Sequence, residues 1–193
     1  MLNRLLIFLV LGAVALTAWG GVAGAADTPE EAADEAYKKA MTARRAVEPI
    51  EERLAITKKF LDEFPESKHT ANAISAVVYY QGNALDDMDG AIAYAESIRA
   101  KITDPGIAEA VDKELIVVYG EAGKMDKMLA IAGRMETAGK LSFGDYWSII
   151  ESGMQAEDWK LVRDYCVKAK GMANAETFKS DYPDYEMSDD ELK

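Results

Sequence analysis

Apolar residues recur at steps of three and four along nearly the whole chain after residue 30, which is the period of an amphipathic helix. The first such segment opens at Thr28-Pro29, where Thr28 suits the N-cap, Pro29 suits the first helical position and Glu31 completes a capping box. Its apolar face comprises Ala33, Ala36, Tyr37, Ala40 and Met41.

The same pattern predicts eight helices, at residues 28–41, 49–64, 69–85, 89–102, 107–122, 125–138, 142–156 and 158–173. Pro65, Pro105, Gly123 and Gly139 separate several of them, as helix breakers do. No stretch after residue 30 shows the alternation of apolar and polar residues that is typical of a β-strand. Helices joined by short turns predict an all-α chain of about four antiparallel helix pairs.

The second helices of successive pairs repeat their apolar positions. The matched sets lie 34 residues apart in the last two pairs and 37 in the preceding step, and they are Ala91, Ala95 and Ile98; Met128, Ala132 and Met135; and Val162, Cys166 and Ala169. The three extra residues are expected in the turn at 85–88. A repeat of this length indicates stacked helical units that bury each other's apolar faces.

These repeats resemble the tetratricopeptide repeat family. The match lies at the family's large, aromatic and glycine positions, which are held by Leu115, Tyr119 and Gly123 in the third pair and by Tyr146 and Ile149 in the fourth. The segment at 60–67 matches the end of a helix followed by proline in that family. The resemblance implies a right-handed α-solenoid over residues 27–173. Larger or missing side chains depart from the pattern at Ile116, Met128, Ile150, Gly153 and Val162, so an ordinary helical bundle remains the alternative.

A solenoid of this family has a concave groove lined by the first helix of each pair. The resemblance therefore implies a scaffold or adaptor that holds a peptide or partner protein, with a structural, self-associating envelope subunit as the alternative. The groove positions carry over to Tyr80, Gln81, Lys113, Val117, Glu121, Trp147, Glu151, Met154 and Gln155. Trp159, just before the last helix, is expected to pack.

The two ends of the chain differ from the repeats. Residues 1–25 combine Arg4, an uncharged apolar run at 5–18 and the cleavage pattern Ala23-Gly24-Ala25, which predicts a signal peptide cut after Ala25 and export to the periplasm. An uncleaved anchor is the alternative. Residues 174–193 are acidic with interleaved aromatics and form either a solvated tail or a cap on the last repeat.

The formal net charge of −12 disfavours nucleic acid and anionic membrane surfaces as partners. The single His69 and single Cys166 lack partners for catalysis or metal binding, and no phosphate-binding loop is present, so we expect neither an enzyme nor a cofactor or metal site. Cys166 is expected to be buried and His69 to be solvated near a helix cap. The run at 86–90 suits a turn better than a calcium loop, because Leu85 cannot bind the ion.

Overall fold

The computed structural model describes residues 28–172, and every regular element in that range is helical. The all-α prediction is confirmed, and all eight predicted helices are present. The signal peptide predicted at residues 1–25 and the tail at 174–193 lie outside the described residues. The elements are α2 (Pro29–Ala46), α3 (Ile50–Glu63), α4 (Thr70–Val77), η1 (Val78–Ala84), α5 (Met88–Arg99), α6 (Pro105–Glu121), α7 (Met125–Thr137), α8 (Phe143–Gln155) and α9 (Trp159–Met172).

Side-chain caps and glycines explain where the helices begin and end. Thr28 accepts a hydrogen bond from the backbone N–H of Glu31 at 3.2 Å, as its N-cap position predicts. Ser142 and Asp145 form a reciprocal capping box at the start of α8. Gly123 and Gly139 have φ values of 66° and 68°, a left-handed conformation that suits glycine after a helix C-terminus.

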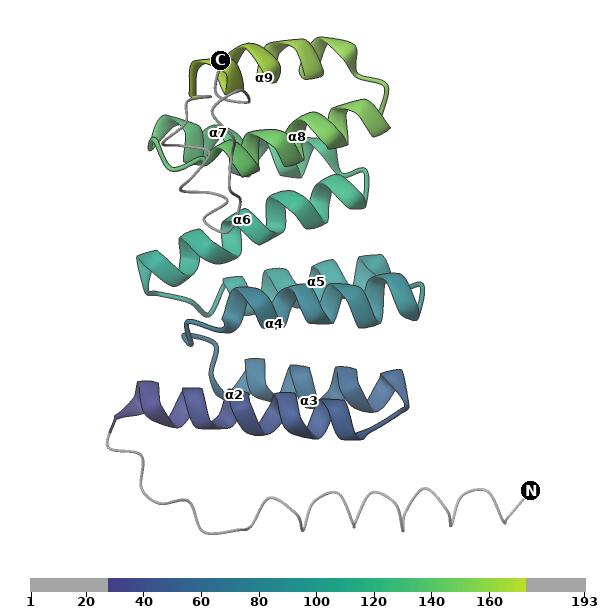
Figure 1. The fold of residues 1–193 in the computed structure, drawn as a ribbon, viewed down its shortest axis with the longest axis vertical. Helices are drawn as coiled ribbons and strands as arrows, with labels where there is room; N and C mark the ends of the chain where they lie inside the picture. The colour runs from purple at the N-terminus through teal and green to yellow at the C-terminus, as the bar shows by residue number, and fades with distance from the viewer. Residues whose placement is uncertain (1–27, 173–193) are drawn as a thin grey trace, which may run out of the picture.

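The helices pack in consecutive pairs: α2 with α3, η1 with α5, α6 with α7, and α8 with α9. Figure 1 shows the pairs following one another in chain order along the long axis, with the helices lying across it. The first helices also contact each other from pair to pair, since α4 packs on α6 and α6 packs on α8. One hydrophobic core runs through all of these contacts, from Ala40 in α2 to Ala169 in α9.

The third predicted helix is continuous but changes its winding at residue 78. α4 passes directly into η1, a π-helix that holds more residues per turn than an α-helix. The three extra residues expected in the turn at 85–88 lie elsewhere, because the 37-residue step runs from Ala91 to Met128 and begins after that turn. They lie in α6, which has 17 residues where the corresponding helix α8 has 13.

The last helix differs from its counterparts in the earlier pairs. Ala95 and Ala132 are fully buried, whereas Cys166 in the matching position is exposed, so the prediction of a buried cysteine is wrong. The reason is positional: later helices follow α5 and α7, but no described helix follows α9. Trp159, expected to pack, is 64% exposed and begins α9.

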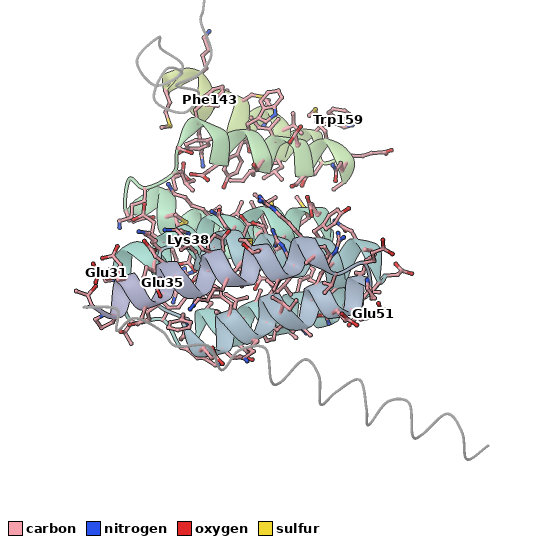
Figure 2. All side chains as sticks on the ribbon, turned by 60° about the horizontal axis from the view of Figure 1, so that its bottom comes forward. Glu31, Glu35, Lys38, Glu51, Phe143 and Trp159 are labelled. Carbon is pink, nitrogen blue, oxygen red and sulfur yellow. The ribbon has the colours of Figure 1, made fainter. Side chains whose placement is uncertain are left out.

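The two ends of the stack present different surfaces. Figure 2 shows Glu31, Glu35 and Lys38 along α2, with Glu51 on α3, and all four are exposed. The same figure places Phe143 and Trp159 at opposite ends of the last helix pair. The first pair is therefore covered with charge, while α9 exposes Trp159 and Val167, which is 70% accessible.

Candidate docking face

The first helix of each of the last three pairs turns one side away from the core. We call the outward side chains of α4/η1, α6 and α8 the first-helix face. Its members recur at the spacing of one helical face, in steps of three, four or seven with two adjacent pairs, and neighbouring helices of the set are in direct contact. They are Asn72, Tyr79, Asn83, Lys113, Glu114, Val117, Glu121, Trp147, Glu151, Met154 and Gln155.

Large apolar side chains are exposed on this face. Tyr79 is 60% exposed, Trp147 45% and Met154 39%, and the half-buried Val117 lies on the helix between them. Exposed aromatic residues on a soluble protein are unusual when they share one surface, and Tyr and Trp are enriched at the centres of binding interfaces. The face therefore has the anchors that an interaction surface needs.

Carboxylates surround these anchors. Glu121 and Glu151 are exposed, and neither forms an ion pair with any residue between 28 and 172. Glu114 is half-buried against α4; burial raises the pKa of its carboxyl, an interaction with the Ser75 hydroxyl partly offsets the rise, and the charge of Glu121 adds to it. The face thus carries negative charge that its own residues leave uncompensated.

Lys113 is the one cation of the first-helix face, and two carboxylates already hold it. Its Nζ lies 3.7 Å from Glu109 Oε1 on the same helix and 3.6 Å from Asp145 Oδ2 on α8. The second ion pair links α6 to α8 across their contact. Lys113 therefore serves to join two helices and contributes little free positive charge to the face.

A pocket of about 550 Å³ opens at one end of the face, where η1 meets α5 and α6 ends. Asn83 and Glu121 belong both to the face and to this pocket. The remaining lining residues are Gly82, Asp86, Asp87, Met88, Asp89, Ala122 and Lys124. The face thus continues into an acidic recess.

The acidic run at 86–90 caps a helix, as the sequence predicts. Asp87 Oδ1 accepts a hydrogen bond from the backbone N–H of Gly90 at 3.0 Å, and the Gln81 side-chain amide donates to Asp87 Oδ2 at 2.6 Å. The bond from Gln81 and then the one from Gly90 lower the pKa of Asp87, so this carboxylate is charged at neutral pH. The other amide atom, Gln81 Oε1, is buried without a hydrogen-bond partner among the described residues.

The structure separates the nine predicted groove residues into two groups. The seven on α6 and α8 all lie on the first-helix face. The two on η1 do not: Tyr80 is buried at 9% exposure with the Arg44 guanidinium 5.6 Å from its ring, and Gln81 turns toward Asp87. Tyr79 and Asn83 take the outward positions instead. Tyr79 and Asn83 lie seven and eleven residues after the exposed Asn72, which is the regular spacing of one helical face, whereas the expected positions Tyr80 and Gln81 came from the slots of the repeat family.

His69 has partners that its sequence position did not reveal. Its ring stacks on Tyr37 with centroids 4.0 Å apart, and its Nε2 lies 3.0 Å from Asp34 Oδ1. The expectation of a solvated histidine is therefore wrong, because α2 covers one side of the ring. These contacts tie the start of α4 to α2.

The described residues contain no cluster of three or more potential metal ligands. Between residues 28 and 172, no helix combines the length and the apolar character needed to span a bilayer. Comparison of the chain with family models, with curated proteins and with solved structures finds no match in any of the three.

Proposed function

We propose that this chain is an exported protein–protein interaction scaffold or adaptor, and that the first-helix face holds a peptide or a partner protein. The observation that carries the proposal is the gathering of Tyr79, Trp147 and Met154 on one face, three of the six large hydrophobic residues that are strongly exposed between residues 28 and 172. Affinity would come from these anchors, with polar neighbours setting the register. The proposal assigns no catalytic residue and no cofactor.

The fold proposed for this function is a right-handed solenoid of about four helix pairs, similar to tetratricopeptide repeats. Two observations support it. The first helices pack on one another in the order α4, α6, α8, and the repeated positions of the second helices, such as Ala95 and Ala132, are fully buried. In an array of this kind each pair contacts its neighbours, which leaves the first helices side by side as an extended surface.

Export to the periplasm is proposed from the pattern of residues 1–25, with cleavage after Ala25. Removal of that segment takes away Arg4 and leaves a chain of even greater negative charge. Such a chain is repelled by phosphate backbones and anionic lipids, so the proposed partner is a protein and neither a nucleic acid nor, after cleavage, a membrane.

Site-specific photo-crosslinking tests the docking role. A photoreactive phenylalanine analogue replaces Trp147 in one variant and Val167 in another, because both positions are exposed but only the first lies on the first-helix face. The proposal predicts a discrete adduct with a second protein from position 147 and none from 167. Equal adducts from both positions, or none from 147 in the native host, would contradict it.

A structural, self-associating subunit is the second candidate, and the open surface of α9 favours it. Trp159 and Val167 are more exposed than any other large hydrophobic residues in the described range. If α9 mediates assembly, sedimentation of the purified mature chain gives a concentration-dependent oligomer that Val167→Glu dissolves. A monomer with a 147-specific adduct favours the adaptor.

A further inference from the structure

We infer that the segment bound by the first-helix face is a basic amphipathic helix, with its apolar stripe on Tyr79, Val117 and Trp147 and its lysines or arginines beside Glu121 and Glu151. This inference rests on the proposed function and names the class of partner that the face accepts. The inference is drawn from three features of the surface: its charge, its dimensions and the absence of a sheet edge with free backbone N–H and C=O groups.

The charge of the face selects a cation. Glu121 and Glu151 have no ion-pair partner in residues 28–172, while Lys113 is already held by Glu109 and Asp145. An acidic segment would meet like charges, and a neutral one would leave the carboxylates without partners. A basic segment complements the charge of the face, which favours both its affinity and its rate of association.

The acidic recess at the end of the face adds further negative charge. Four carboxylates line it, on Asp86, Asp87, Asp89 and Glu121. Its one cation, Lys124, is occupied, since its Nζ lies 2.5 Å from Asp89 Oδ1. The long side chain of a lysine or arginine reaches such a recess while its aliphatic stem stays on the apolar anchors.

The dimensions favour a helix that crosses several first helices. The first helices α4, α6 and α8 pack in that order, and packed helices lie about 8–10 Å apart, so a partner that crosses from the first to the last spans roughly two such spacings, or ~16–20 Å. A partner helix covers that span in three to four turns of about 5.4 Å each. Its apolar stripe, flanked by cations, matches the sequence of anchors and carboxylates on the face.

An extended partner strand lacks a counterpart on this surface. Strand addition requires an exposed sheet edge with free backbone N–H and C=O groups. Every regular element between residues 28 and 172 is a helix, so the first-helix face has no such edge to offer. Side-chain contacts must carry the binding, as they do when an amphipathic helix lies in a groove.

Three synthetic helical peptides of about 18 residues, ~27 Å long, serve as probes. They share one leucine stripe, and their polar positions are all lysine, all glutamine or all glutamate. Calorimetric titration of the purified mature chain is expected to give about tenfold tighter binding of the lysine peptide than of the glutamine peptide, because a few exposed ion pairs sum to that factor. The glutamate peptide is expected to bind most weakly.

Two double variants separate a specific effect from the general attraction of a cation to an acidic protein. Glu121→Gln with Glu151→Gln should remove most of the lysine peptide's advantage, whereas Glu51→Gln with Glu52→Gln, exposed on the first helix pair, should leave it within about twofold. An equal loss in both variants would overturn the inference.

The same titrations distinguish failure of the charge assignment from failure of the docking function. If all three peptides bind equally and Trp147→Ala weakens each, the face docks peptides but the basic partner is wrong. If no peptide's binding depends on Trp147, the basic partner and the proposed function are both overturned.

Discussion

Ser152 on α8 occupies the space that a side chain at position 120 of α6 would need. A Cβ built on Gly120 would lie 2.0 Å from Ser152 Oγ and 3.1 Å from its Cβ. The contact between α6 and α8 is therefore close because position 120 carries no side chain, and this contact joins the third and fourth helix pairs.

Gly120→Ala is expected to destabilise the fold by about 1–3 kcal/mol, the usual cost of overpacking a tight contact. Urea unfolding of the purified chain followed by circular dichroism measures the change. Ser152→Gly in the same chain removes the clashing atoms and should restore part of the loss, beyond its own cost as a helical glycine. A Gly120→Ala chain as stable as the parent would contradict the close α6–α8 contact.

The ion pair between Arg99 and Asp112 joins α5 to α6. Arg99 Nε donates to Asp112 Oδ1 at 2.7 Å and Nη2 donates to Oδ2 at 3.2 Å, while the Asp112 side chain is only 13% exposed. Asp112→Ala should cost about 2 kcal/mol in the free energy of unfolding, because it leaves a partly buried guanidinium without its partner. Thermal denaturation of this variant and of Asp164→Ala, whose ion pairs are largely exposed, checks the prediction; similar losses would contradict it.

Glu96 should make the fold sensitive to acid. Lys127 Nζ and the Tyr119 hydroxyl each donate to Glu96 Oε1 at 2.6 Å, and they lower the pKa of this carboxyl in the folded chain. Its contribution to stability is therefore present above its ordinary pKa of 4.5 and is lost as the pH falls through the lower folded value. Glu96→Gln should reduce the urea midpoint at pH 7 but change it less at pH 3. An equal reduction at both values would contradict this assignment.

Glu114 should behave in the opposite way. Burial raises its folded pKa above the ordinary value of 4.5, so its ionisation opposes folding as the pH rises from 4.5 through the folded pKa. Glu114→Gln keeps a side chain of the same shape without the charge. The variant should have a higher urea midpoint than the parent at pH 7 and the same midpoint at pH 4. A lower midpoint at pH 7 would show that the charge is stabilised by a partner.

The Cys166 thiol should react in the native chain. It is exposed on α9, whereas Ala132 occupies the matching position of α7 with no exposure. Labelling with a thiol reagent such as 5,5′-dithiobis(2-nitrobenzoate) should therefore proceed in the folded chain at a rate close to that in urea. An Ala132→Cys, Cys166→Ala chain supplies the buried control and should react only on unfolding. Slow labelling of Cys166 would contradict its exposure.

The helices and their ends were predictable because their causes are local. The apolar period, the caps at Thr28 and Ser142 and the glycines at 123 and 139 all act within a few residues. The outward residues of α6 and α8 were equally predictable, since both helices keep the regular period that places Val117 and Trp147.

What the sequence did not reveal depends on neighbours far along the chain. Tyr80 is buried and Tyr79 is exposed because α3 and α5 pack on η1, and no pattern within that helix identifies these neighbours. Cys166 follows the repeat in sequence, but its burial depends on a following helix that the described residues do not contain. His69 gains its stacking partner Tyr37 from a helix more than twenty residues earlier.

The most direct test of the docking face compares two exposed tryptophans. Calorimetry measures the affinity of the purified chain, of Trp147→Ala and of Trp159→Ala for the partner segment crosslinked from position 147. Because Trp147 lies on the first-helix face and Trp159 lies on α9, the first substitution should weaken binding at least about tenfold and the second less than about twofold, with helicity unchanged in both. Equal losses, or a greater loss at Trp159, would contradict the account.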